Sequence, residues 1–512
     1  MKYLFAATAL IILSCGLALR ATFPSSQSDV PVLYWTTGLT DVRYDQIDAF
    51  EKWLVEEQGM TGPDGGPPVD IRLDAGNDDV SKKLIQSVSG VAGDLIDMRG
   101  GDRVRYLQDT GALMDVTEAA KSMGFDPSAT YPTITEEFVI DGKQYGFPCN
   151  VVTRLYWVNV EAFERLGMEV PPRRWTIEEF ERIGKEFVER ANAGDGPRRH
   201  FFANGVDTLQ MLRTMGGAVF NETLTASTLH ERAFVETLKL KRRWTEVDHI
   251  LPSTAEKASF SGESGTNKDY QLFVAGNYGL FASNRWASVN LRQLGAGELS
   301  VSFPPYEVLE NSVAGARVAT IYKLTEHPEL AKKFLQFLAT EPYNRQIIKD
   351  GDALPPNPRY TELESFLRPP EHPNEWGTHG MFARAAKTIA IPRVYSPFIL
   401  DSDVSRLFKE ANDAVLAGRL TAEEAAQRAS DRINARIERE VEKRPELQGR
   451  YAAQMEKQRE IDALRAAGEP VPLKMIDNQV RRKLASQQRG EAEAAAARAS
   501  GGEAILVEGV RN

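Results

Sequence analysis

Hydrogen-bonding side chains stand at two places where a strand-like run ends, and at the first of them they stand beside aromatic rings. Tyr34 to Thr37 closes the run that begins at Val30 and offers two rings and three hydroxyl groups. The second group, Asp97 to Arg99 with Asp102, follows a shorter apolar run. Such rings stack on the C–H faces of a pyranose, and such polar groups pair with its hydroxyls. These residues favour binding of a polyhydroxylated molecule. The candidate ligand-binding residues are Trp35, Thr36, Thr37, Asp97 and Arg99.

Side chains arranged for catalysis or for a metal are not evident in the sequence. The six histidines are scattered, and none has the spacing of a His-x-x-x-His motif or a Gly-x-Ser-x-Gly context. Asp74, Asp78 and Asp79 lack the spacing and the terminal glutamate of an EF-hand, so a strand end with a helix cap is favoured over a calcium loop. Carboxylate pairs like those of glycosidases stay possible, although no residue points to them. We expect no enzyme, no metal and no cofactor.

Strands and helices alternate in the first part of the chain. The patterns predict strands at 30–36, 69–73 and 95–98, with helices at 41–58 and 79–88 between them. Asp78 or Asp79 is suited to cap the second helix. This order predicts a mostly parallel sheet with helices on both faces, which would place ligands at the carboxyl ends of its strands.

A longer motif extends from Tyr145 to Trp175. A strand-like run from Val151 to Val160 leads into a helical pattern that stops at Gly167, and a second helix begins after a Pro-Pro-x-x-Trp turn. If the strand alternates, one face carries Asn150, Arg154 and Tyr156, and the other carries Leu155 and Trp157. Trp175 is favoured as a structural residue. Trp53 and Trp244 lie in helical patterns that suit either core or surface.

The order of these parts resembles the inter-domain crossover of family 1 extracellular solute-binding proteins, which include the maltose-binding proteins of bacterial ABC importers. Three later blocks follow in the order of that family. They are Gly276 to Phe281 with Asn284 to Trp286, Gly315 to Tyr322 with a helix at 331–338, and the loop from Asp350 to Pro356. The resemblance covers residues 30 to 438.

The resemblance implies an α/β type II periplasmic-binding-protein fold with two lobes that close on a carbohydrate or related polyol. Lobe 1 would contain residues 30–150 with 298–345, and lobe 2 residues 151–297 with 346–438. The implied partners are ABC permease subunits, and we expect a monomer. Asp352 is less favoured as a ligand contact, whereas the crossover and the later blocks add these candidates: Asn150, Arg154, Tyr156, Trp286 and Tyr395.

The N-terminal segment, residues 1–22, has the pattern of an export signal. Met1-Lys2 precedes an apolar run from Tyr3 to Leu19, and Ile12 to Cys15 is similar to a lipobox. Lipidation at Cys15, cleavage near Ala21 and a retained membrane anchor remain alternatives. All three place the body of the protein outside the cytoplasm, in the periplasm or cell envelope. With only two cysteines in the chain, no disulfide framework is available.

Length and charge set further limits. A chain of 512 residues is too long for one compact core, and its net charge of −10 gives no electrostatic reason to bind nucleic acid. Residues 439–512 are rich in Arg, Glu, Gln and Ala and are predicted to be a charged helical or disordered tail. If that tail binds a partner, the alternative function is an envelope ligand sensor or scaffold. The sequence does not identify the solute.

Overall fold

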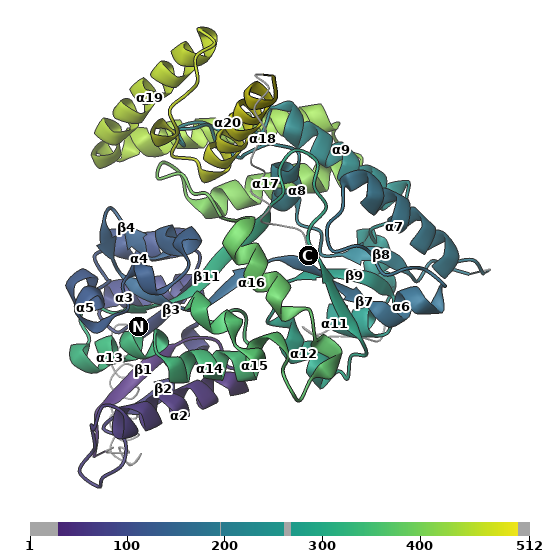
Figure 1. Cartoon of the computed structure of the whole chain (residues 1–512). Helices are drawn as coiled ribbons and strands as arrows, with labels where there is room; N and C mark the ends of the chain where they lie inside the picture. Colours follow the sequence, from purple (N-terminus) through teal and green to yellow (C-terminus); the bar gives the residue numbers. More distant parts are fainter. Residues whose placement is uncertain (1–28, 195, 261–267, 500–512) are drawn as a thin grey trace, which may run out of the picture.

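A computed structural model of the chain describes residues 29–194, 196–260 and 268–499 (Figure 1). The predictions for residues 1–22, Cys15 included, lie outside these ranges. In the described ranges, no helix is both long enough and apolar enough to span a membrane.

The first sheet has six strands. Its order is β12-β11-β3-β1-β2, and β6 pairs with β11. The parallel pairing of β1 with β2 and β3 confirms the predicted parallel arrangement, but β11 pairs antiparallel with both β3 and β6, so the complete sheet is mixed. The strands are β1 (Val32–Thr36), β2 (Asp70–Leu73), β3 (Leu95–Arg99), β6 (Gly146–Thr153), β11 (Ser312–Ile321) and β12 (Ala390–Pro392).

Helices pack against this sheet through aromatic side chains. In α2, the apolar residues Ile47, Phe50, Trp53 and Leu54 are buried, and the Phe50 ring lies 5.3 Å from that of Phe334 in α13. Asp79 caps α3 by accepting hydrogen bonds from two backbone amides, which confirms one of the two predicted caps. The helices of this lobe are α2 (Asp41–Glu56), α3 (Val80–Ser89), α4 (Gly101–Asp109), α5 (Thr117–Met123), α13 (Pro328–Leu338) and α14 (Glu341–Asp350).

The second sheet has the order β10-β7-β9-β8. Trp175 is buried beside it and donates from Nε1 to the Phe303 carbonyl at 2.8 Å, so this residue is structural, as expected. Trp53 and Trp244 are also buried. The strands are β7 (Leu155–Asn159), β8 (Phe201–Asn204), β9 (Tyr278–Ser283) and β10 (Leu299–Ser302). The helices are α6 (Val160–Arg165), α7 (Ile177–Ala191), α8 (Thr208–Thr214), α9 (Arg232–Glu246), α10 (Thr254–Ser259), α11 (Lys268–Val274) and α12 (Ala287–Gln293).

Two segments connect the two sheets, and a third leads from the first sheet to a helix that packs on the second lobe. Arg154 joins β6 to β7, residues 303–311 join β10 to β11, and residues 393–400 join β12 to α17 (Asp401–Leu416). The changes between sheets therefore fall at residue 154 and between β10 and β11, whereas the sequence-based division placed them after residues 150 and 297.

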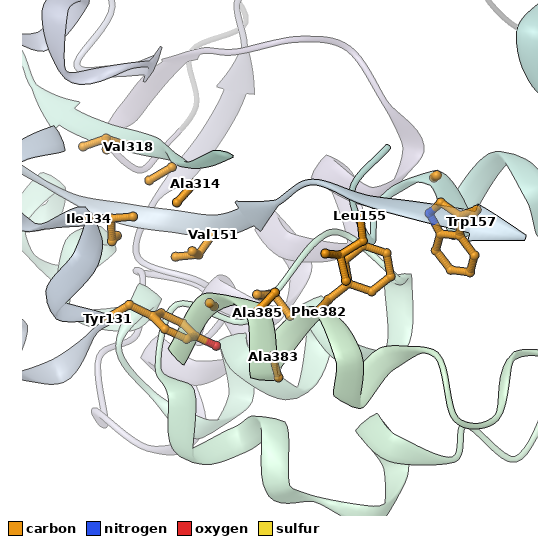
Figure 2. Packing of buried hydrophobic residues seen from close by; sticks show 14 of the residues in the cluster. Tyr131, Ile134, Val151, Leu155, Trp157, Ala314, Val318, Phe382, Ala383 and Ala385 are labelled. Carbon is orange, nitrogen blue, oxygen red and sulfur yellow. The ribbon is translucent and has the colours of Figure 1, made fainter. Parts of the chain in front are cut away.

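The crossover from β6 to β7 runs through the largest hydrophobic cluster (Figure 2). Val151, Leu155 and Trp157 of these strands lie over α16 (His379–Thr388). The Trp157 ring is 5.2 Å from that of Phe382 in this helix. Because one continuous cluster extends across both sheets, the junction between the lobes is a packed core and not a loose linker.

The C-terminal part folds back on the second lobe (Figure 1). Arg465 and Gln458 of this part bind Glu222, Asn478 donates to the Phe220 carbonyl at 2.7 Å, and Ile461 is fully buried. Residues 439–499 are therefore largely helical and partly docked. The helices are α18 (Ala422–Lys443), α19 (Pro445–Ala466) and α20 (Gln479–Ala499).

Candidate functional site

The carboxyl ends of strands from both sheets lie at the crossover. In the first sheet, Arg317 of β11 pairs with Arg99, the last residue of β3, and with Asn150 near the end of β6. In the second sheet, Ser283 at the end of β9 pairs with Leu155, the first residue of β7. Loops that follow β1, β3, β8 and β9 thus border the segment that joins the lobes, where open α/β sheets place ligands.

A buried network of charged side chains fills the first-sheet side of this junction. Arg317 Nη1 lies 2.7 Å from Asp97 Oδ2, and Arg317 Nη2 lies 3.7 Å from Asp352 Oδ2. Asp352 also pairs with Arg43 at 2.8 Å. Two carboxylates and two guanidinium groups therefore compensate one another away from water.

Neutral predicted residues complete this network. Trp35 Nε1 donates to Asp97 Oδ1 at 2.7 Å, and Thr37 Oγ1 donates to Asp97 Oδ2 at 2.6 Å. Asn150 Nδ2 donates to Asp352 Oδ1 at 3.0 Å. All are buried, as is the predicted Thr36, whose hydroxyl donates to Asp74 at 3.4 Å. The structure thus brings these predicted residues together but directs their polar atoms to one another.

The network shifts the pKa values of its members. Burial raises the pKa of Asp352, but the charges of Arg43 and Arg317 outweigh it and lower that pKa to about 2. The pKa of Asp97 is likewise lowered, because Arg317 and the two hydrogen-bond donors outweigh burial. Burial, with the Asp97 charge, raises the pKa of the Cys149 thiol well above its usual value. Both carboxylates are therefore ionised at neutral pH.

Next to this buried network, Arg99 and Asp78 form a pair of charged side chains that solvent can reach. The Arg99 side chain is 56% exposed and lies 3.4 Å from Asp78 Oδ2. The buried Lys83 Nζ donates to Asp78 Oδ1 at 2.6 Å and also to the Asp97 carbonyl. A Cβ at Gly38 would lie 3.2 Å from the Asp78 carboxylate, so the glycine leaves this surface open. Among the residues predicted in the first lobe, Arg99 is the one whose charged head remains accessible.

In the second lobe, the two predicted crossover residues have different positions. Arg154 is partly exposed and donates to the carbonyls of Gly205 and Ala282 at 2.9 and 3.2 Å. Tyr156 is 2% exposed, and its ring lies 6.1 Å from that of Phe180. Successive side chains of β7 do point to opposite faces of the strand, but helices cover both faces. Tyr156 is therefore in the core instead of on a ligand-facing surface.

Trp286 presents an accessible ring at the end of β9. It is 38% exposed, stands at the N-terminus of α12, and meets Tyr270 edge to face at 5.9 Å. Neighbouring Arg285 is fully buried and donates to the Ala353 carbonyl at 2.6 Å and to His379 Nδ1 at 3.0 Å. Burial and the Arg285 charge lower the pKa of His379 to about 4, so this imidazole is neutral and accepts that bond. The loop carrying Trp286 is thereby fixed to the loop that carries Asp352.

A second group of titratable residues surrounds the predicted Tyr395, which is half-buried. Arg393 Nε donates to Asp401 Oδ1 at 3.2 Å. Burial and the Asp401 charge raise the pKa of Asp102 to about 6, and burial together with the Asp102 charge raises that of Glu137 to about 8. Carboxyl groups that hold their protons near neutral pH can donate as well as accept hydrogen bonds.

Sequence reasoning missed several of these residues. Arg43, Arg317 and Glu137 lie in patterns that read as an ordinary helix, strand and loop, so no local signal distinguishes them. Arg393 and Asp401 flank the chosen Tyr395, and their proximity could have drawn attention to them. The part of the chain that the structure describes contains no group of three or more His, Cys, Asp or Glu side chains suited to a metal ion.

Two sheets whose strand ends meet at a shared junction are the arrangement that a type II periplasmic-binding-protein fold has. Residues 48–345, more than half of the chain, match the family model described as bacterial extracellular solute-binding protein. The chain belongs to this family. This confirms the resemblance found in the sequence, and the family's members act outside the cytoplasm.

Individual proteins agree with this assignment. The maltodextrin-binding protein MdxE of Bacillus subtilis is 24% identical over 268 residues, which are 50% of this chain and 59% of that protein. This chain therefore matches well under two thirds of the curated relative's length. Two solved structures, both under 25% identical, share the fold.

The first is an ABC substrate-binding protein from Listeria monocytogenes in complex with cycloalternan, with a TM-score of 0.66 and 20% identity over 79% of this chain and 98% of the other. The second is the GacH receptor of Streptomyces glaucescens, studied with acarbose, with a TM-score of 0.62 and 18% identity over 80% and 99%. The type II periplasmic-binding-protein fold is thereby confirmed.

Proposed function

We propose that this chain captures a carbohydrate or related polyol between its two lobes and delivers it to the permease of an ABC transporter. The observation that carries the proposal is the meeting of strand ends from both sheets at the crossover, with Trp286 accessible on one side and Arg99 on the other. The named relative binds maltodextrin, and the solved neighbours bind cyclic or linear oligosaccharides. These support the ligand class.

Each accessible residue has a role suited to a sugar. The Trp286 ring offers an apolar face for pyranose C–H groups, held in place by Arg285 beneath its loop. Arg99 and Arg154 supply guanidinium donors for hydroxyls. Asp102 and Tyr395 add groups that can donate or accept. The ligand would favour the closed arrangement because only that arrangement offers contacts from both lobes.

Replacement of Trp286 by alanine tests the proposal. A half-exposed ring supports little of the fold, so we expect the ligand-free melting temperature to stay the same while sugar affinity falls by about tenfold or more. The measurement is thermal shift and calorimetry with malto-oligosaccharides, cyclic glucans and monosaccharides.

Trp376 supplies the matched control. This tryptophan is 49% exposed, and adjacent Asn374 binds the carbonyls of residues 296 and 297, at the amino end of β10 and away from the junction. Trp376→Ala should bind sugar like the parent. If Trp286→Ala and Trp376→Ala lose sugar binding equally, or if both keep it, Trp286 is not part of the site. If the parent protein binds no sugar at all, the proposed function is refuted.

We also propose that the protein works at the cell envelope as a monomer, tethered to the membrane through its N-terminal segment. The lipobox-like Ile12 to Cys15 supports a lipid on Cys15. Mass spectrometry of the N-terminus from membrane fractions would identify a diacylglyceryl group, and Cys15→Ser should release the protein in soluble form. If Cys15→Ser stays in the membrane fraction as the parent does, lipidation is contradicted. An intact, unmodified N-terminus in the parent would also contradict it.

A further inference from the structure

A cavity lies at the carboxyl end of β8. Its volume is about 660 Å³, and it is bounded by residues 203–206, α9, α10 with the turn before it, and the C-terminal end of α17. None of its lining residues comes from the first sheet or from the segments that cross between the lobes. It therefore adjoins the proposed sugar site only at the loop after β8, where Gly205 accepts the hydrogen bond from Arg154, and its other walls lie away from the crossover.

Cationic side chains outnumber anionic ones around this cavity. Lys241, Lys257, Lys409 and Arg419 line it, against Glu246 and Asp413. Lys409 pairs with Asp413, which leaves three cations and one carboxylate. In a chain whose net charge is −10, such a local excess of positive charge would attract anions.

The ammonium of Lys241 has no carboxylate partner. In the described part of the chain, its Nζ donates to the Thr208 hydroxyl and forms no ion pair within 4 Å. Its side chain is partly buried, and the loss of hydration lowers the pKa of Lys241 to about 8. Two of its three N–H donors are left for another acceptor.

Asn204 is a second unsatisfied group on the same wall. It ends β8, is 2% exposed and lines the cavity. Neither its amide nitrogen nor its amide oxygen has a hydrogen-bond partner among the described residues. Buried amides almost always have partners in folded proteins, so this amide, in a cavity that the Lys241 ammonium also lines, suits a ligand that accepts hydrogen bonds.

We propose that this cavity binds a phosphate-type oxyanion, which accepts hydrogen bonds from Lys241 and Asn204 and faces Lys257 and Arg419 at the rim. The oxyanion is either free phosphate or a phosphate carried by a sugar. This site is additional to the proposed carbohydrate site and does not depend on it, because its walls come from one lobe and α17 alone.

The test is a calorimetric titration of the full-length protein at pH 7 with inorganic phosphate and, separately, with glucose 6-phosphate, each against chloride of matched ionic strength. Lys241→Met should weaken binding by roughly tenfold or more without loss of stability, because methionine fits the buried stem and removes an uncompensated charge. Lys239→Met is the control, since Lys239 is on the same helix but pairs with Glu236 and Glu423 outside the cavity.

The pH profile supplies a second readout. The charged groups around Lys241 are Asp207 before α8, Lys257 of α10, Asp413 of α17 and Arg154 of the crossover. Phosphate remains a dianion above pH 8, so affinity should fall there as Lys241 loses its proton, and the fall should be absent in Lys241→Met. Binding of inorganic phosphate identifies a free anion, and binding of glucose 6-phosphate alone identifies a sugar-borne one. Binding of neither, or equal binding by Lys241→Met, overturns the proposal.

Discussion

Removal of Arg317 is expected to destabilise the first lobe through charge and not through lost volume. Arg317 is 4% exposed and lies between Asp97 and Asp352, which are themselves buried. In Arg317→Met, the apolar stem is kept, but Asp97 loses its only ion pair among the described residues. Loss of one partner from a buried pair costs about 3–5 kcal/mol. Arg99→Met, which removes an exposed arginine, should cost about 0–1 kcal/mol.

The pH dependence separates the charge effect from a packing effect. In the parent protein, the pKa values of Asp97 and Asp352 lie below the unfolded value of about 3.9, so their stabilisation is present above pH 4 and is lost as pH falls toward 2. Without Arg317, burial raises the pKa of Asp97, and its ionised form then disfavours folding as pH rises. The difference in unfolding free energy between parent and Arg317→Met should therefore be smaller at pH 4 than at pH 7.

Urea denaturation followed by tryptophan fluorescence, at pH 4 to 7, measures this difference. A second change, Asp97→Asn in the Arg317→Met background, should restore part of the stability because it removes the unpaired charge. A cost below about 1 kcal/mol, or a cost that does not change with pH, would refute the reasoning.

Three further expectations follow from buried groups. The pKa of Glu137 is about 8 in the folded protein, above its unfolded value, so Glu137 contributes stability at low pH that is lost as pH rises toward 8. Glu137→Gln removes the charge that forms at high pH. It should therefore raise the melting temperature at pH 8.5 and change it little at pH 5. In a Cys15→Ser background, Cys149 should react with a thiol reagent only after unfolding, and fast native reaction would contradict its burial. Ile461→Asp places a charge at a buried position and should release α19 from the second lobe. Limited proteolysis should then cut within residues 445–466. The control Glu460→Gln, on the exposed face of the same helix, should leave these residues protected.

Local patterns predicted the elements better than the exposure of particular side chains. The strand and helix positions of the first lobe follow from periodicity, and Asp79 follows from capping preferences. Trp35 was selected because polar residues follow it, yet alternation in β1 already places Leu33 and Trp35 on the core side. Counting from the buried end of the strand would have assigned the tryptophan to the interior.

Other features depend on contacts that no local pattern contains. Arg317 meets Asp97 across 220 positions in the sequence, and Arg43 meets Asp352 across 309. Tyr156 differs from a half-exposed strand residue only because helices cover both faces of its sheet. Trp286 is 38% exposed, and its contact with ligand remains a prediction.

The strand order of the first sheet also determines when this chain can fold. β3 needs β11 as its neighbour, and the Asp97 charge needs an arginine that the ribosome adds 220 residues later. At about 5–20 residues per second, that interval is about 10 to 40 s. Until then, the N-terminal lobe lacks a sheet neighbour and holds an uncompensated carboxylate, so it cannot reach its native state. The first lobe therefore completes its sheet only after most of the second lobe has been synthesised.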